Sequence, residues 1–196
     1  MKSKNFGIEN LLNKGNGMKK INTKALAQAA ILLAICVLSQ FLKNLSVYIT
    51  GPIINTCLII CVLTAGLGCA IILSVIPPIT SFIITGSPIM AAIPLIIPCV
   101  MVGNAILVIC VAVLKNKPNT KIGEPLSMVI GSILKAAFMG VVISLLIIPM
   151  MLPSQMAPQM TVFQTTFSLT QLITALMGSI FAYIIMIPLK KVLKNE

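Results

Sequence analysis

The sequence predicts an all-α membrane protein, a compact bundle of about six transmembrane helices with both termini in the cytoplasm. Of its 196 residues, 58% are hydrophobic and only 9% are charged, whereas soluble domains carry about 25% charged residues. A helix needs roughly 20 apolar residues to cross the hydrocarbon core, so six spans with short connections use nearly all of these residues. We therefore expect one membrane domain, at residues 25–190, and no second, soluble domain.

The positions of the charged residues set the predicted orientation. All 14 basic residues are lysines, and twelve of them fall into three clusters, within residues 2–24, 115–121 and 190–194. Lys43 stands alone after the first apolar segment, and Lys135 lies inside the fifth. Because lysines accumulate in cytoplasmic loops beside membrane spans, an even number of spans places all three clusters in the cytoplasm. The same positions favour contact with the lipid bilayer rather than with nucleic acid.

Six apolar segments are expected to cross the membrane, between a basic cytoplasmic leader at residues 1–24 and a cytoplasmic tail at residues 191–196. Glycine, proline and lysine residues mark the ends of these segments. The predicted spans lie at residues 25–42, 52–67, 68–85, 88–114, 125–149 and 167–188.

Glycine and proline residues define the second and third spans. Pro52 opens the second span, since proline is tolerated in the first turn of a helix. Gly66 and Gly68 interrupt a continuous apolar run, which predicts a tight, uncharged turn. The Pro77-Pro78 pair is expected to break or kink the third span. Irregular backbone at membrane depth requires burial in protein or a wet cavity, so this pair indicates either kinked packing or a cavity.

The later spans differ in their connections. Pro94 and Pro98 are expected to bend the first half of the fourth span. Residues 115–124 form the clearly charged internal loop, whereas residues 150–166, between the fifth and sixth spans, are rich in Pro, Met and Gln and carry no charge.

The residue types exclude several functions. The chain has no His, Asp or Arg, and its acids, Glu9, Glu124 and Glu196, lie outside the predicted spans. Intramembrane proteolysis, a zinc site and a carboxylate or histidine proton relay lack the required side chains. No GxxxxGK[ST] phosphate loop occurs. We therefore predict that the chain is not an enzyme, has no cofactor, and depends on a partner for the energy of any uphill transport.

Six cysteines lie within the apolar segments. Since the chain has no His or Asp to complete a metal shell, we interpret the cysteines as small buried packing residues and expect no metal site. They are Cys36, Cys57, Cys61, Cys69, Cys99 and Cys110.

Lys135 is the main candidate for a functional side chain. It follows about ten residues into the fifth span, roughly 14 Å deep at 1.5 Å per residue. An ionisable residue at membrane depth indicates a functional site because burying it is costly. One interpretation is a positive anchor for an anionic ligand, which favours a carboxylate-containing substrate. The alternative is a lysine that extends to the interface or bonds to helix-end carbonyls.

Four amide side chains also lie within the spans. Asn55 and Gln171 are expected near the outer ends of their helices, where they can bond to a polar solute. For Asn104 and Gln40, hydrogen bonding between helices is the favoured interpretation. The candidate substrate-binding residues are thus Lys135, Asn55, Gln171 and Asn104.

The first span carries small residues at helical spacing. Its Ala-xxx-Ala pairs allow another helix, in this chain or in another subunit, to approach closely. The residues are Ala25, Ala29, Ala30 and Ala34.

Taken in order, these features resemble the substrate-binding S component of energy-coupling factor (ECF) transporters, the vitamin-uptake systems of bacteria. The resemblance covers about residues 20–192 and includes six spans in fewer than 200 residues and a basic leader. The chain departs from many members of the family in lacking Trp, which often stacks on the ligand. The segments that carry the resemblance are 23–27 (TKALA), 51–55 (GPIIN), 77–78 (PP), 101–105 (MVGNA) and 171–178 (QLITALMG).

The resemblance implies a multi-pass protein of the bacterial plasma membrane that binds a vitamin or related micronutrient from outside. It implies transport in a complex with a membrane coupling subunit and two cytoplasmic ATPase subunits, with the four alanines of the first span contacting the coupling subunit. The alternative from another class is a structural or pore-forming, holin-like membrane protein. Such a protein needs only helix packing and conducts without stoichiometric ligand binding.

Overall fold

The structure is a computed structural model that describes residues 23–42, 46–115 and 123–194, with side chains up to residue 191. The regular elements in these ranges are all helices, and six helical segments there are long and apolar enough to cross a membrane. The predicted all-α bundle of about six transmembrane helices is therefore confirmed. Most of the expected leader, Lys43 and part of the charged loop lie outside the described residues.

Six segments of sequence form the spans. The first four are α2 (Thr23–Gln40), α3 (Val47–Thr64), α4 (Leu67–Thr85) and α6 (Ile96–Leu114), with the short α5 (Pro88–Ala92) before α6. The fifth consists of α7 (Gly123–Met139), the wider π-helix η1 (Gly140–Ile147) and α8 (Ile148–Met151). The last consists of the 3-10 helix η2 (Ser154–Gln159), α9 (Met160–Phe167) and α10 (Leu169–Lys194).

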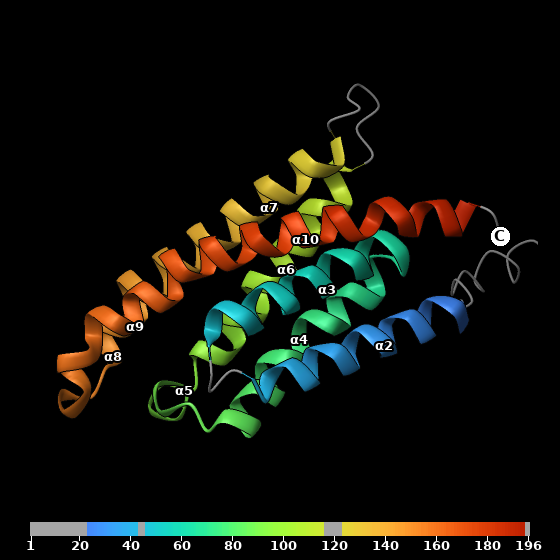
Figure 1. The fold of residues 1–196 in the computed structure, drawn as a ribbon. Helices are drawn as coiled ribbons and strands as arrows, with labels where there is room; N and C mark the ends of the chain where they lie inside the picture. The colour runs from blue at the N-terminus through green and yellow to red at the C-terminus, as the bar shows by residue number, and fades with distance from the viewer. Residues whose placement is uncertain (1–22, 43–45, 116–122, 195–196) are drawn as a thin grey trace, which may run out of the picture.

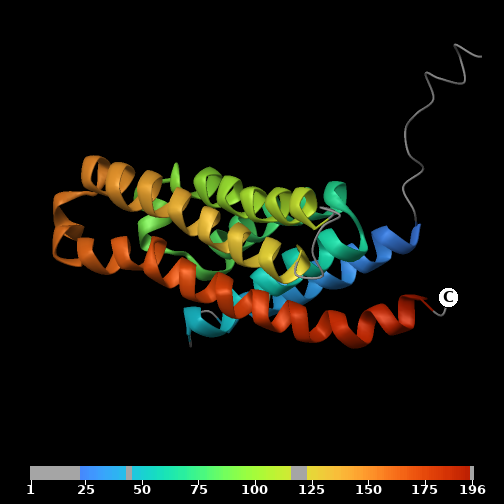
Figure 2. The same cartoon turned by 90° about the horizontal axis from the view of Figure 1, so that it is seen from above.

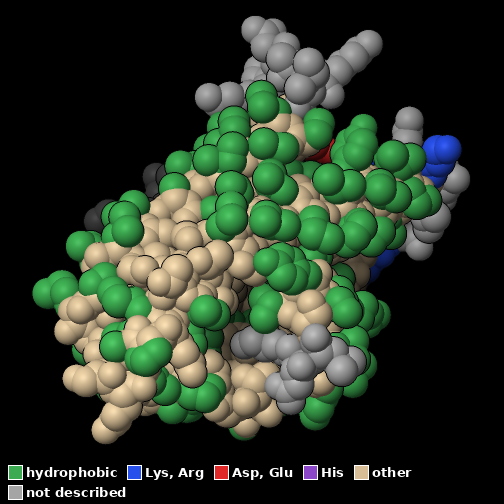
Figure 3. Space-filling view, turned by 60° about the vertical axis from the view of Figure 1, so that its left-hand side comes forward, with side chains coloured by type: hydrophobic (Ala, Val, Ile, Leu, Met, Phe, Trp, Pro, Cys, Tyr) green, Lys and Arg blue, Asp and Glu red, His purple; other side chains and the backbone are tan. Residues whose placement is uncertain are grey.

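The helix α3 forms the centre of the bundle. It contacts α2, α4, α6 and α10, and it is the most buried of the six spans. Large apolar side chains on the outer helices point outward instead, for example Ile31, Leu38 and Ile83, which are more than half exposed. Hydrophobic side chains accordingly spread over much of the face seen in Figure 3. Such a surface is suited to lipid, because patches of this extent are rare on soluble monomers.

The lysines that the structure describes gather at one end of the bundle, apart from Lys135. Here α2 begins, α3 gives way to α4, α6 ends, α7 begins and α10 ends (Figures 1 and 2). We call this the lysine end, after Lys24, Lys115, Lys190 and Lys191. The opposite, or far, end carries α5, α8, η2 and α9 (Figure 1).

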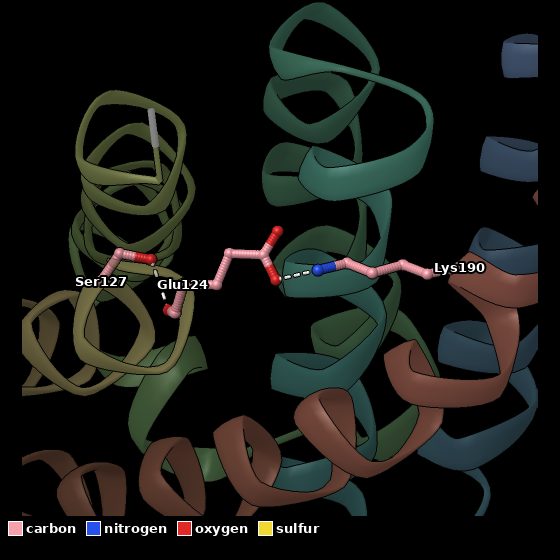
Figure 4. A network of polar contacts seen from close by, with 3 residues as sticks. All are labelled: Glu124, Ser127 and Lys190. Carbon is pink, nitrogen blue, oxygen red and sulfur yellow. Dashed lines mark hydrogen bonds and ion pairs between the residues drawn. The ribbon is translucent and has the colours of Figure 1, made fainter. Parts of the chain in front are cut away.

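Two contacts at the lysine end join helices that are distant in sequence. The Lys190 ammonium of α10 pairs with the Glu124 carboxylate in the first turn of α7, where Ser127 Oγ donates to the Glu124 carbonyl at 2.6 Å (Figure 4). Lys115, after α6, donates from Nζ to the Val62 carbonyl near the end of α3 at 3.1 Å. Both contacts place charge where a helix end favours it. Glu124 is an anion at the N-terminus of α7, and Lys115 and Lys190 are cations near the C-termini of α6 and α10.

Proline acts differently at the three predicted positions. The expectation that Pro52 opens the second span was wrong, because α3 already begins at Val47 and Pro52 lies inside it. The structure keeps α4 as one helix through Pro77 and Pro78, so of the two expected outcomes, a break or a kink, the break does not occur. The expected span at 88–114 is instead two helices, separated by residues 93–95. Pro94 accounts for this, since the residue before a proline is pushed out of the helical region. Ile93 accordingly has φ −130° and ψ 81°.

Candidate functional site

Lys135 is buried at the meeting point of three helices. Its side chain is 3% exposed, and Nζ donates to Asn55 Oδ1 of α3 at 2.6 Å and to Asn104 Oδ1 of α6 at 2.7 Å. We call these three residues the Lys135 cluster. The ammonium therefore bonds inside the bundle. It does not extend to the membrane interface, which was one of the alternatives that the sequence left open.

The proline pair in α4 connects that helix to the Lys135 cluster. Pro78 has no N–H, so the Ser74 carbonyl four residues earlier receives no backbone hydrogen bond from it. Asn104 Nδ2 donates to this carbonyl at 3.3 Å. The amide of Asn104 is thereby held at both ends, with its oxygen on Lys135 and its nitrogen on α4.

Close helix packing positions the other members of the cluster. A Cβ on Gly178 of α10 would lie 2.6 Å from Asn55 Cβ and 3.0 Å from the Pro52 carbonyl, so this helix crossing requires glycine. A Cβ on Gly103 of α6 would lie 2.9 Å from the Met139 side chain of α7. The two glycines let α10 and α7 approach α3 and α6 closely, and so fix the distances between Asn55, Asn104 and Lys135.

The Lys135 cluster lines a cavity of about 260 Å³ toward the far end of the bundle. Its wall is mostly apolar, as in small-molecule sites, where a few polar groups fix the orientation of the ligand. Among the described residues that line it, Lys135 is the single charged side chain. The apolar wall includes Ile54, Pro77, Met90, Val100, Phe163 and Phe167, and hydroxyl or amide groups come from Thr50, Ser81, Ser87, Thr166 and Gln171.

The helix α9 covers one side of this cavity and is tied to the fifth span. Ser144 Oγ of η1 donates to the Gln164 carbonyl at 2.8 Å, and Gln164 Nε2 donates back to the Ser144 carbonyl at 2.9 Å. This reciprocal pair holds the helix that carries Phe163 and Phe167 against the bundle.

The candidate residues from the sequence are placed as follows. Lys135, Asn55 and Asn104 bond to one another, and Gln171 lines the same cavity from the first turn of α10. Gln40 lies elsewhere, where its Nε2 donates to the Pro77 carbonyl at 3.0 Å. This bond joins α2 to α4.

Sequence reasoning missed the cavity wall that α5 and α9 supply. Phe163 comes from the segment 150–166, which the pattern placed in a connecting loop, whereas Met90 and Phe167 lie at the starts of the predicted fourth and sixth spans. At five and eight residues, these helices are too short for a clear periodic signal. The apolar side chains within the uncharged segment 150–166 were the one signal of a buried face.

The four alanines of α2 lie apart from the cavity. Ala25 and Ala29 are partly buried, whereas Ala30 and Ala34 are exposed on the outer face of the helix. The cysteines Cys36, Cys57 and Cys61 are buried free thiols within the main apolar core.

Together, these features define a multi-pass α-helical membrane protein with an internal cavity, apolar in its walls and polar at the Lys135 cluster. No protein-family model, curated protein or solved structure matches this chain.

Proposed function

We propose that this protein is the substrate-binding S component of an ECF-type importer for a vitamin or related micronutrient in the bacterial plasma membrane. The cavity beside the Lys135 cluster is the observation that carries the proposal. A helix bundle that needs only to pack in lipid has no use for three buried polar side chains beside an open volume, because polar groups in a membrane interior are costly.

The position of the cavity supports binding from outside. Besides residues of α4, α6 and α7, its lining includes α5, α9 and the first turns of α3 and α10, all of which lie toward the far end. If the lysine end faces the cytoplasm, as lysine accumulation favours, the cavity lies in the outer half of the membrane.

The partners in this proposal are a membrane coupling subunit and two cytoplasmic ATPase subunits. The chain has no phosphate-binding loop, so the energy for transport comes from them. The exposed small side chains of Ala30 and Ala34, beside Ile31 and Leu38 on α2, offer a surface on which a helix of the coupling subunit can pack closely.

A ligand screen tests the proposal. The protein, purified in detergent, is screened by thermal shift and native mass spectrometry against water-soluble vitamins and their precursors. A ligand at a thousandfold excess over its Kd stabilises by about 4 kcal/mol. We expect one strong ligand that binds with a stoichiometry of one.

Matched tryptophan variants locate the binding site. Val100→Trp fills the cavity and should abolish binding, whereas Val102→Trp adds the same side chain on the exposed face of the same helix and should preserve it. A folded protein that binds none of the compounds and conducts ions in bilayers would replace the importer proposal with the pore-forming class.

A further inference from the structure

The charge balance around Lys135 is incomplete. The acids of the chain are Glu9, Glu124 and Glu196, of which only Glu124 lies within the described membrane domain. Glu124 is eleven residues before Lys135 on the same helix, roughly 16 Å away at 1.5 Å per residue, and it pairs with Lys190. No carboxylate of the described residues therefore reaches Lys135.

The hydrogen bonds of Lys135 to the described residues are also incomplete. A lysine ammonium has three N–H donors, and the Asn55 and Asn104 oxygens take two of them. Amide oxygens stabilise a cation without neutralising it, and a buried charge without a partner costs far more than a paired one. Lys135 lines the cavity, so an anion bound there can supply both the third acceptor and the missing charge.

The remaining wall limits the size and charge of that anion. Beyond Lys135, no charged residue of the described chain lines the cavity, and apolar side chains such as Ile54, Val100 and Phe167 dominate its surface. A phosphate monoester carries about 1.5 to 2 negative charges and needs several donors, whereas a carboxylate carries one. A single lysine in an apolar cavity of about 260 Å³ therefore matches one carboxylate on a small, otherwise uncharged molecule.

We propose that the ligand of this cavity is a small monocarboxylate whose carboxylate binds Lys135 Nζ while its uncharged part lies against the apolar wall. This inference rests on the proposed function, since it names the substrate class of the same site.

Matched acid and amide compounds test the inference on the unchanged protein. The probes are nicotinate with nicotinamide, pantothenate with panthenol, and benzoate with benzamide, each at millimolar concentration in thermal-shift and native mass spectrometry measurements. We expect at least one acid to raise the unfolding midpoint while its neutral partner does not. This comparison needs no variant, so it holds even if a substitution at Lys135 prevents folding.

Two lysine variants then assign the effect to one side chain. Lys135→Met should weaken binding of that acid by about a hundredfold or more, as expected when one partner of a buried charge pair is removed. Lys191→Met removes an exposed lysine at the opposite end and should leave the affinity unchanged.

The failures of the two proposals are distinguishable. A neutral compound that binds as tightly as its acid, or an acid that still binds to folded Lys135→Met protein, would overturn the monocarboxylate inference and leave the importer proposal standing. If no acid binds but a neutral vitamin does, the inference again fails alone. If neither acids nor neutral vitamins bind, both fail.

Discussion

At the scale of single residues, the contribution of a polar side chain to stability depends on how deeply it is buried. The Lys135 cluster is almost wholly excluded from the surface, with Asn55 and Asn104 only 2% and 3% exposed. The Lys190 side chain, by contrast, is 50% exposed in its pair with Glu124. Buried polar groups lose heavily when a partner is removed, whereas exposed ion pairs contribute about 0 to 1 kcal/mol.

Asn104→Leu should lower the free energy of unfolding by about 1 to 3 kcal/mol, because it leaves the Ser74 carbonyl without its donor and Lys135 with one acceptor fewer. Unfolding by denaturing detergent, followed by circular dichroism, measures the change. Gln155→Leu replaces an exposed amide in η2 and should change the stability by less than about 0.5 kcal/mol. Equal effects of the two substitutions would show that the bonds of Asn104 contribute nothing specific.

Lys190→Met should lower the free energy of unfolding by less than about 1 kcal/mol, since the pair with Glu124 is partly in solvent. The same unfolding measurement, repeated at high salt, should show that the small difference from the unchanged protein disappears. A loss as large as that of Asn104→Leu would contradict this estimate.

At the scale of secondary-structure elements, close crossings of helices place the cluster, and the short far-end helices enclose the cavity. Gly51 of α3 faces Thr174 of α10, where a Cβ would lie 2.8 Å from the threonine side chain. Gly178 makes the second close approach one turn further along α10. At the second contact, Thr56 Oγ1 also donates to the Gly178 carbonyl at 3.1 Å. The crossing of α3 and α10 is therefore fixed on the two sides of Asn55.

Gly178→Ala should destabilise the protein by about 1 to 3 kcal/mol, the usual effect of overpacking a close contact. It should also weaken ligand binding, because the added methyl group pushes Asn55 and its helix away from α10. Gly68→Ala is the matched control, since a Cβ there meets no atom within 4 Å. Detergent unfolding and thermal-shift titration measure the two effects. Unchanged binding in folded Gly178→Ala protein would show that the close crossing of α3 and α10 does not determine ligand binding.

Gln164→Leu should loosen α9. It removes the bond from Gln164 Nε2 to the Ser144 carbonyl, and the other bond of the pair, from Ser144 Oγ to the Gln164 carbonyl, depends on the position that the first one holds. We expect amide hydrogen exchange in residues 160–167 to become about tenfold faster, with no change in α3. Thr165→Val is the control, since among the described residues the Thr165 hydroxyl bonds only to the Thr161 carbonyl of its own helix. Equal exchange in the two variants would contradict a role of this pair in holding α9.

At the scale of the whole molecule, the cavity and the described lysines other than Lys135 lie toward opposite ends. The lysine end carries Lys24, Lys115, Lys190 and Lys191, and the far end surrounds the cavity with α5 and α9. The outer surfaces between the two ends are apolar and suited to lipid. If the lysine end faces the cytoplasm, this asymmetry places the cavity on the outer side, from which the substrate of the proposed importer would arrive.

Reporter fusions in bacterial cells test this orientation. Alkaline phosphatase fused after Gln159, at the far end, should be active, since the enzyme folds only outside the cytoplasm. Green fluorescent protein fused after the last residue should be fluorescent, with the phosphatase inactive at the same place. The reverse pattern would place the lysine end outside and would contradict the positive-inside assignment.

The sequence by itself determined the properties that depend on neighbouring residues. Hydropathy and span length depend only on local composition, so they predicted the six-helix membrane bundle that the structure confirms. The depth of Lys135 follows in the same way from its distance to the start of its helix. The short turn at Gly66 was also predicted, and there φ is +92°, a value that favours glycine.

Only the tertiary structure decided which side chains share a site. Lys135 is 80 residues from Asn55 and 31 from Asn104, and a periodic pattern says which residues are apolar but not which face of one helix meets which face of another. Close approaches at Gly103 and Gly178 fix those faces. The bond from Asn104 to the Ser74 carbonyl of α4, which receives no backbone hydrogen bond from Pro78, fixes them further. The cavity is thus a product of packing, because it exists only where the five spans after α2 meet the short helices at the far end.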